Sequence, residues 1–345
     1  MWQHPGPHRR PLFSRNTGGG RFVPVSILIL GALVLLFSLV EPAQPPAAIR
    51  PGSVTIPAFT PTPTALPMPT DVHGGRIVFT CTRKGINQIC LIKADGTGYA
   101  QLTSGEQNSY YPDISPDGND VVFAVNKYDD FDLGLIALRA PVEPQSRRLS
   151  ENIGNVFCPV FSPDGTQIAF VNKVVGSPAA LWTMGLHGEQ PRPLYQPAHD
   201  IAGAAWSPDG KAIAFTMSPN LGSSYEVFIL DLEAPARAPR RVSQGLSGIG
   251  GSVSWSSDRR SILVFAGPVA AREIYRLDAI TGAHTQLSFG GNNAAAAYSP
   301  DGQMIVFNSL RNGDQADLYT MRADGHSIRQ LTNNPEPDWQ PQWGP

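Results

Sequence analysis

The sequence predicts an all-β protein, a six-bladed β-propeller with four-stranded antiparallel blades. The first observation is a turn sequence whose serines recur at spacings of 47, 45, 49 and 43 residues, the repeat length of propeller blades. The second is composition: 34 glycines and 33 prolines among 345 residues are typical of short strands joined by turns. The third is an apolar strand that follows each turn and ends in phenylalanine.

The repeated turn reads Ser-Pro-Asp-Gly at residues 115–118, 162–165, 207–210 and 299–302. Proline presets φ at the second turn position, aspartate suits the third, and glycine tolerates the positive φ that follows. A degraded copy at residues 256–259 has Arg259 in place of the glycine. Because positive φ costs a non-glycine residue on the order of 1 kcal/mol, we expect this loop to take another shape.

Three further strands complete each unit. The strand after the turn covers residues 121–123, 168–170, 213–215, 263–265 and 305–307, and residues 77–79 form a sixth copy. The third strand is expected at residues 89–92, 133–136, 181–184, 227–230, 274–277 and 318–321. The fourth is expected to end in a Leu-Thr-like pair at residues 102–103, 149–150, 242–243, 287–288 and 331–332, with a looser copy at 194–195. Four strands in about 45 residues are typical of one blade.

The C-terminal segment is expected to complete the first blade. The first unit begins at residue 75 without a strand before its turn. Trp343 falls in the C-terminal segment where Trp206 and Trp255 fall in their units. Pairing of this segment with the first blade would close the ring and leave no open sheet edge.

The repeat resembles that of TolB-type propellers over residues 73–345. Residues 318–325 read Leu-Tyr-Thr-Met-Arg-Ala-Asp-Gly and residues 329–332 read Arg-Gln-Leu-Thr. The resemblance implies a propeller fold. TolB is a soluble periplasmic protein with an α/β domain before its propeller, whereas here an apolar stretch and a proline-rich stretch occupy that place. A role in the Tol system, with the Pal lipoprotein as partner, is therefore not carried over.

The first 72 residues are expected to lie outside the fold. Residues 1–22 carry four arginines and no acid, and residues 23–40 carry no charge. Eighteen helical residues span about 27 Å, enough for a bilayer core, so we expect a signal anchor with a cytoplasmic N-terminus. A cleaved signal peptide is the alternative. Residues 41–72 contain nine prolines and are expected to form a disordered linker that holds the propeller outside the cytoplasm, in the periplasm.

Few residues suggest chemistry. Asp129, Asp130 and Asp132 form the one candidate calcium cluster, and otherwise neither metal nor cofactor is expected. Cys81 and Cys90 flank a predicted hairpin, so a disulfide is plausible outside the cytoplasm, with two buried thiols as the alternative. Cys158 has no evident partner and is expected in the core. Residues 73–345 hold 21 basic and 26 acidic residues, a net charge of −5 that argues against nucleic-acid binding.

Aromatic residues at the starts of the first strands are the candidate binding residues. Tyr110, Tyr111, Phe157 and Trp339 are expected near the mouth of the central channel. The sequence thus favours a non-catalytic, membrane-tethered propeller that binds a protein, peptide or glycan. A calcium-dependent propeller hydrolase of lactonase or glycan-cleaving type is the alternative by analogy of fold, and a sensor that signals through the span is a third hypothesis.

Overall fold

The computed structural model describes residues 74–127, 130–139, 146–220 and 224–345. The predicted cytoplasmic segment, membrane span and linker, residues 1–22, 23–40 and 41–72, lie outside the described residues. Among the described residues, no helix has the length and apolarity needed to cross a membrane.

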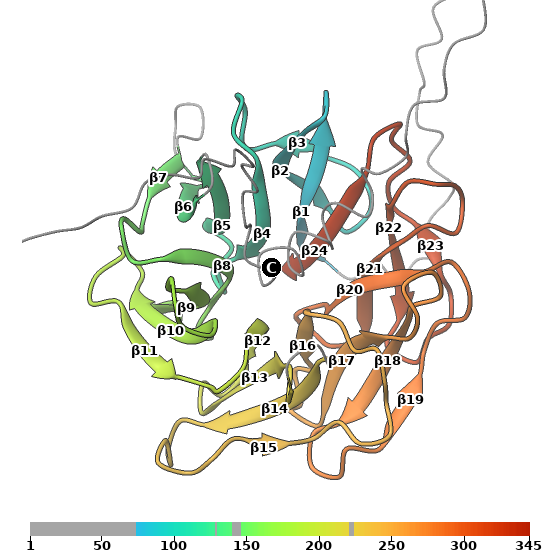
Figure 1. Ribbon diagram of the computed structural model, residues 1–345. Coiled ribbons are helices and arrows are strands. Elements are labelled where there is room, and N and C mark those ends of the chain that lie inside the picture. Colours follow the sequence, from blue (N-terminus) through green and yellow to red (C-terminus); the bar gives the residue numbers. More distant parts are fainter. Residues whose placement is uncertain (1–73, 128–129, 140–145, 221–223) are drawn as a thin grey trace, which may run out of the picture. The chain divides into compact units, whose positions relative to one another are not determined.

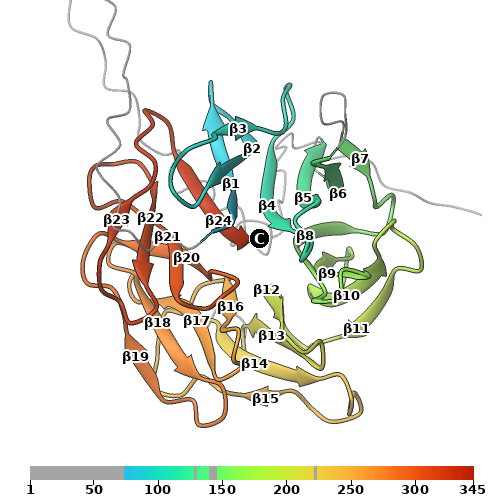
Figure 2. The same cartoon turned by 180° about the vertical axis from the view of Figure 1, so that it is seen from behind.

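Six four-stranded antiparallel sheets surround a common centre (Figures 1 and 2). Each sheet is one blade, so the predicted fold class is confirmed. The strands closest to the centre are β24 (Asp338–Gly344), β4 (Ser109–Ile114), β8 (Asn155–Phe161), β12 (Ile201–Trp206), β16 (Val253–Trp255) and β20 (Asn293–Tyr298). They are followed outward by β1 (Arg76–Arg83), β5 (Asp120–Lys127), β9 (Gln167–Lys173), β13 (Ala212–Met217), β17 (Ser261–Ala266) and β21 (Met304–Ser309).

The third strands are β2 (Ile86–Lys93), β6 (Asp130–Ala137), β10 (Ala180–Gly185), β14 (Glu226–Asp231), β18 (Glu273–Asp278) and β22 (Asp317–Arg322). The outer strands are β3 (Ala100–Gln101), β7 (Ser146–Arg148), β11 (Arg192–Tyr195), β15 (Arg240–Arg241), β19 (His284–Gln286) and β23 (Arg329–Gln330). Outer strands of two to four residues offer little free edge for pairing with another chain.

The predicted closure of the ring is confirmed. The C-terminal strand β24 pairs antiparallel with β1, with Trp343 opposite Ile77 and Trp339 opposite Thr80. The first blade therefore has the order β24-β1-β2-β3. Residues more than 250 positions apart in the sequence are thus hydrogen-bonded neighbours, and no blade keeps an unpaired inner strand.

The hydrophobic core consists of layers between neighbouring blades. One cluster joins Val122 and Leu133 of the second blade to Phe161, Ile168 and Phe170 of the third. The phenylalanines that end the predicted apolar runs are all at most 2% exposed: Phe79, Phe123, Phe170, Phe215, Phe265 and Phe307. Because both faces of each sheet are covered, these strands are nearly continuous apolar runs.

In five blades the Leu-Thr-like pair follows the outer strand instead of ending it, which corrects the predicted boundary, whereas the looser pair at residues 194–195 ends β11 as predicted. In five blades the leucine or valine N–H donates to a carbonyl of the third strand, and the next hydroxyl accepts from the N–H of that same residue. Leu149 N donates to Leu133 O (2.8 Å) and Ser150 Oγ accepts from Leu133 N (2.8 Å). The other hydroxyl acceptors are Thr103, Ser243, Ser288 and Thr332. The side chain therefore replaces a ladder bond where the outer strand leaves the sheet.

Two faces of the propeller are distinguished by these connections. The turn face carries the Ser-Pro-Asp-Gly turns between the first and second strands of each blade. The mouth face carries the starts of the inner strands and the hairpins between the second and third strands, such as residues 83–86. Gly75, where the described chain enters the propeller, lies beside Gly344 at the turn-face end of β24.

The degraded turn keeps the shape of the others, contrary to the prediction. Arg259 adopts φ 62°, and its N–H donates to Ser256 O (3.0 Å) as the glycine does in the other turns. Its guanidinium forms an ion pair with Asp209, in the turn of the preceding blade. The repeat thus imposes the turn on a residue that prefers negative φ, and the ion pair offsets part of that cost.

We expect Arg259→Gly to raise the free energy of unfolding by up to about 1 kcal/mol when Asp209→Asn has already removed the ion pair. The gain reflects release of an unfavourable positive φ. Chemical denaturation of the full chain measures it. Arg260→Gly, at a neighbouring position without positive φ, is the matched control and should give no gain. Equal effects of the two glycines would show that position 259 is not strained.

Candidate functional site

The four aromatic residues that the sequence singled out lie together on the mouth face. The ring centroids of Tyr110 and Trp339 are 6.1 Å apart in an edge-to-face arrangement, and those of Tyr110 and Tyr111 are 6.2 Å apart. Phe131 joins Tyr110 (5.9 Å) to Phe157 (4.9 Å). These five side chains, hereafter the aromatic cluster, come from β24, β4, β6 and β8 and thus from three successive blades.

A bulge in each contributing inner strand sets the direction of these side chains. Register shifts lie between Tyr110 and Asp113 and between Phe157 and Val160. Tyr111 at φ 52° and Cys158 at φ 47° occupy equivalent bulge positions. Bulges re-aim side chains and occur near binding sites, and positive φ in non-glycine residues persists where surrounding contacts enforce it.

The third bulge lies in the closing strand β24 at Gln340, whose side chain forms hydrogen bonds beside the aromatic cluster. Its φ is 52°. Its Oε1 accepts hydrogen bonds from Thr80 Oγ1 (2.9 Å) and from Tyr111 N (3.1 Å). One side-chain amide therefore connects the closing strand β24, the adjacent strand β1 and the inner strand β4. This fixes Trp339 relative to Tyr110 and Tyr111.

Asparagine and aspartate side chains connect successive blades at the mouth face. In each case the acceptor is a side-chain oxygen beside the start of an inner strand. The donor is a backbone N–H of the preceding blade, and it lies in or just before the third strand of that blade. The pairs are Asn87 N to Asn108 (2.8 Å), Phe131 N to Asn155 (2.9 Å), Ala179 N to Asp200 (2.6 Å) and Arg272 N to Asn292 (3.2 Å). Asn87 Nδ2 also donates to Tyr110 OH (3.2 Å). These interblade bonds hold the backbone that carries the aromatic cluster.

Sequence reasoning missed Phe131 and Tyr225, which occupy the same repeat position as Asn87. Each lies two residues before the apolar run of a third strand. Tyr225 is half-buried and forms an isolated bridge with Ile249. An alignment of the repeats at this position would have revealed both residues, but the apolar strand motifs alone do not extend to it.

The candidate calcium residues are not brought together among the described residues. Asp132 is 6% exposed, forms an ion pair with Arg148 and accepts from Ser150 Oγ (3.2 Å). Asp130 is exposed at the start of β6, and Asp129 lies outside the described residues. Over the described ranges, no group of three or more His, Cys, Asp or Glu side chains is arranged to hold a metal ion. Asp132 thus has a structural role beside the outer strand.

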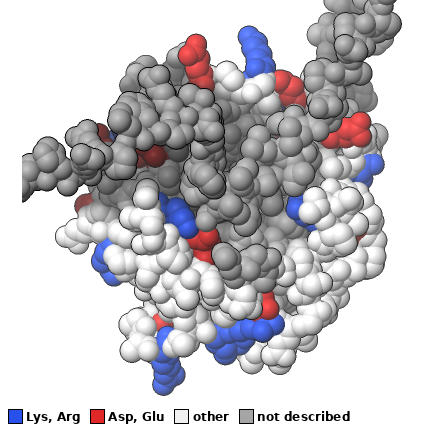
Figure 3. Space-filling model, in the orientation of Figure 1, with Lys and Arg blue, Asp and Glu red and all other residues white. Residues whose placement is uncertain are grey.

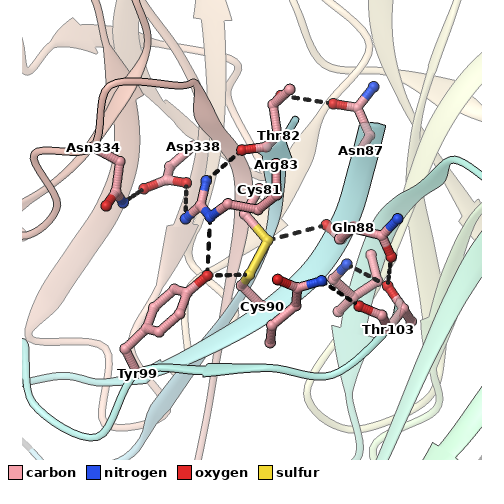
Figure 4. The surroundings of a disulfide bond; sticks show 12 residues. Cys81, Thr82, Arg83, Asn87, Gln88, Cys90, Tyr99, Thr103, Asn334 and Asp338 are labelled. Carbon is pink, nitrogen blue, oxygen red and sulfur yellow. Dashed lines mark hydrogen bonds and ion pairs between the residues drawn. A yellow bond between two sulfur atoms is a disulfide. The ribbon is translucent and has the colours of Figure 1, made fainter. Parts of the chain in front are cut away.

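Cys81 and Cys90 form a disulfide between β1 and β2, with a Cα–Cα distance of 5.9 Å (Figure 4). Tyr99 OH lies 3.0 Å from Cys90 Sγ and accepts from Arg83 Nε (3.1 Å). Arg83 Nη2 donates to Asp338 at 3.0 Å. Cys81 is opposite Asp338 in the register of β1 and β24, so the disulfide lies directly beside the start of the closing strand.

Burial raises the pKa values of two ionisable groups on the inner strands. Burial raises the pKa of the Cys158 thiol to about 12, and its Sγ donates to Ala202 O (3.3 Å). Cys158 is half-buried and packs against the core cluster between the third and fourth blades. Burial also raises the pKa of Asp113 to about 7, although its Oδ2 accepts from Phe161 N at 2.7 Å. Asp113 thereby joins the inner strands β4 and β8.

We expect the free energy of unfolding to fall as pH rises from about 4 to about 7, with Asp113 contributing roughly 2 to 4 kcal/mol. In the folded chain this carboxyl stays protonated up to about pH 7, whereas its ordinary pKa is 3.8. The folded state therefore holds the extra proton between these values and loses its advantage as pH rises. Denaturation of the wild type and of Asp113→Asn across this range measures the effect. Parallel pH profiles for the two proteins would contradict it.

Charged side chains form no continuous patch on the visible surface. Figure 3 shows basic and acidic side chains scattered over the described atoms of one face, without a continuous patch of one sign. Two arginines of the first and second blades are paired with acids, Arg83 with Asp338 and Arg148 with Asp132. The aromatic cluster itself consists of apolar rings with side-chain amides beside them, and the exposed acid Asp130 directly precedes Phe131.

Comparisons with known proteins agree with this architecture. No protein-family model matches the chain. An uncharacterized protein of Agrobacterium fabrum, Atu1656, is 30% identical over 197 residues, which are 54% of this chain and 61% of that protein. The Tol-Pal system protein TolB of Anaeromyxobacter dehalogenans is 35% identical over 92 residues, 27% of this chain and 21% of that protein. The chain thus spans about three fifths and one fifth of these two curated relatives.

Among solved structures, TolB from Acinetobacter baumannii superimposes with a TM-score of 0.68 and 22% identity. The superposition covers 79% of this chain and 67% of that one. At this identity the likeness concerns the fold. The described part of the chain is a TolB-like six-bladed β-propeller.

Proposed function

We propose that this protein is a membrane-tethered propeller outside the cytoplasm that binds a partner through its aromatic cluster and is not an enzyme. The observation that carries the proposal is the aromatic cluster itself, with Tyr110, Phe131 and Trp339 in mutual contact on the mouth face. Aromatic side chains supply large, rigid contact area and are enriched where proteins bind one another. A TolB-like propeller supports such a protein-binding role.

Partial exposure of the rings favours binding over packing alone. Tyr111, Phe131, Phe157 and Trp339 are each only half-buried, whereas Tyr110, which contacts three of them, is 7% exposed. Four exposed large apolar side chains also lie on mouth-face loops: Val174, Val175, Val269 and Phe289, the last 75% exposed. A partner that covers this face would remove apolar surface from water at about 25 cal/mol per Å².

The sequence of the N-terminal region supports the membrane tether, and the disulfide supports a location outside the cytoplasm. The uncharged residues 23–40 fit a bilayer span, with arginines only on the N-terminal side, which favours a cytoplasmic N-terminus. The disulfide between Cys81 and Cys90 is of a kind that persists in oxidising compartments. Protease digestion of spheroplasts should therefore remove the propeller while sparing the N-terminal segment.

Partner capture from membranes that hold the full chain tests the binding role. We expect cross-linking and affinity purification to recover the same partner with the wild type and with Ile280→Ala, whose residue is 77% exposed in a turn-face loop. Phe131→Ala combined with Phe157→Ala should lose that partner. If the double variant does not fold, Phe157→Leu replaces it, because leucine retains most of the apolar volume of phenylalanine. Recovery that is equal for all variants would contradict the proposal, and a melting shift with Ca²⁺ that EDTA reverses would favour the hydrolase instead.

A further inference from the structure

We propose that Arg272 and Arg311, on the mouth face between the fifth and sixth blades, bind a carboxylate of the partner polypeptide that has an apolar residue beside it. This inference rests on the proposed function and names a contact of the partner outside the aromatic cluster. Three observations carry it: both arginines are half-buried, neither pairs with an acid among the described residues, and exposed apolar side chains lie on the loops around them.

Both arginines lie in hairpins that connect the second and third strands of adjacent blades (Figure 1). Arg272 directly precedes β18 in the fifth blade, and Arg311 follows β21 in the sixth. Asn293, at the start of β20, contacts both residues. Its N–H donates to Arg272 O (2.7 Å), and its Oδ1 accepts from Arg311 Nη2 (3.0 Å). One asparagine therefore connects the two arginines across the boundary between the blades.

Each guanidinium packs over aromatic rings of the core layer between these two blades. Arg272 Cζ lies 5.6 Å from the ring centroid of Phe265. Arg311 Cζ lies 4.9 Å from the ring centroid of Tyr319 and 5.4 Å from that of Phe307. All three rings belong to one hydrophobic cluster that joins the blades. A ring covers one face of a guanidinium, whereas the N–H groups at its edge can still donate to the two oxygens of a carboxylate.

The charge of Arg272 is not neutralised by any described residue. Its guanidinium forms neither an ion pair nor a hydrogen bond within the described ranges, and burial lowers its pKa. Arg311 donates to neutral oxygens, from Nε to Ser309 Oγ (3.0 Å) and from Nη2 to Asn293. Asp314, the exposed acid of its hairpin, forms no ion pair with a described residue. A half-buried cation without a counter-ion has lost hydration without compensation, so a bound anion would stabilise it.

Glu273 is the buried acid of this region, and three other groups already donate to it. Its Oε2 accepts from Ser288 Oγ (2.6 Å) and from Asn293 Nδ2 (2.7 Å), and its Oε1 accepts from Gly290 N. Its charge raises the pKa of Arg311. Two arginines and one acid leave one positive charge, which a single carboxylate balances. A phosphate group carries about −1.5 to −2 and would place excess negative charge beside Glu273.

Exposed apolar side chains in the same loops favour a polypeptide as the source of the carboxylate. Val269, in the Arg272 hairpin, is 55% exposed, and Phe289 is 75% exposed. Phe289 lies between the two residues whose hydroxyl and N–H donate to Glu273. An acidic peptide segment or a chain terminus can place an apolar side chain next to its carboxylate, whereas a uronic acid carries no such side chain. Recognition of a carboxylate together with a neighbouring side chain is a recurring mode of peptide binding.

Titration of the full chain with fluorescent, C-terminally amidated peptides tests the proposal. We expect Gly-Ser-Leu-Glu-Leu-Ser-Gly to bind at least about tenfold more tightly than the same peptide with glutamine in place of glutamate. Arg272→Gln should weaken binding of the glutamate peptide about tenfold, because it removes charge-assisted hydrogen bonds. Arg237→Gln, at an exposed position in a turn-face loop, removes the same charge and should leave the affinity unchanged.

A second peptide, Gly-Ser-Gly-Ser-Val-Leu with a free C-terminus, identifies the source of the carboxylate. Tighter binding of this peptide than of the glutamate peptide assigns the site to a chain terminus, and the reverse assigns it to an acidic side chain. Either result supports the site when Arg272→Gln weakens the binding. Arg272→Lys keeps the charge and loses the paired donors, so it should retain part of the affinity. It replaces Arg272→Gln if that variant does not fold.

Three outcomes would overturn the proposal. The first is equal binding of the glutamate and glutamine peptides, or binding of neither the glutamate peptide nor the free C-terminus. The second is an equal loss of affinity in Arg272→Gln and Arg237→Gln. The third is binding of a hyaluronan tetrasaccharide that Arg272→Gln abolishes while neither peptide binds, which would replace the polypeptide by a glycan. The proposed function fails separately, if partner capture from membranes is the same with and without the rings of Phe131 and Phe157.

Discussion

Deletion of residues 338–345 is expected to abolish the cooperative thermal unfolding of the propeller. The deletion removes all of β24, Asp338–Gly344, which is the inner strand of the first blade and pairs with β1. Without it Ile77 and Val78, both 0% exposed, would lose the covering strand, and β1 would present an open inner edge. A loss of this kind is comparable with the whole stability of a domain, about 5 to 15 kcal/mol. Thermal melting of the full chain and of the deletion, followed by circular dichroism, measures the difference.

A smaller deletion controls for the shortening of the chain. Removal of Pro345 alone takes away an exposed residue whose carbonyl accepts from Arg76 Nε at 3.2 Å. We expect this variant to melt within a few degrees of the wild type, because it retains every β24 pairing. A deletion of residues 338–345 that melts like the wild type would refute closure by the C-terminal strand.

Asp338→Ala is expected to lower the free energy of unfolding by about 2 to 4 kcal/mol. The Asp338 side chain is 0% exposed and pairs with Arg83 Nη2 at 3.0 Å, and it also accepts from Asn334 Nδ2. Burial raises the pKa of Asp338, while Arg83 and Asn334 oppose that shift. Removing the carboxylate leaves the Arg83 guanidinium and the Asn334 amide without their shared acceptor (Figure 4).

Asp314→Ala, which removes an exposed acid from a mouth-face hairpin, is the matched control. Exposed substitutions of this kind change stability by about 0.5 kcal/mol or less. Urea denaturation of both variants gives the comparison. If Asp338→Ala costs no more than Asp314→Ala, the contact between β1 and the closing strand does not hold the first blade in place.

The architecture could be predicted from the sequence because each blade repeats the same local chemistry. The Ser-Pro-Asp-Gly turn and the apolar run that ends in phenylalanine are properties of neighbouring residues, and the sequence repeats the turn in four intact copies and one degraded copy and the run in six. The match between the C-terminal segment and the inner strands predicted the closure that the pairing of β24 with β1 confirms. At Arg259 the prediction was wrong, because contacts across blades enforce a backbone conformation that the residue alone disfavours.

The site was predictable only in part, because its geometry depends on contacts between blades. Tyr110, Tyr111, Phe157 and Trp339 lie on inner strands, and the repeat placed them near the centre. Phe131 lies at the start of a third strand and reaches Phe157 of the next blade, a contact that no spacing along the chain encodes. The bonds from Phe131 N to Asn155 and from Asn87 N to Asn108 likewise join different blades. Hydroxyls in the Leu-Thr-like pairs were visible as a pattern, but their role as backbone acceptors required the fold.

Site-specific photo-cross-linking in native membranes tests most directly whether the aromatic cluster binds a partner. A photoreactive phenylalanine analogue replaces Phe157 in one full-length variant and Ile280, on a turn-face loop, in another. The proposed function predicts a cross-linked protein at position 157 that is absent at position 280 and is lost when Phe131→Ala is added. Cross-links at position 280 alone, or none at either position, would contradict a binding site at the aromatic cluster.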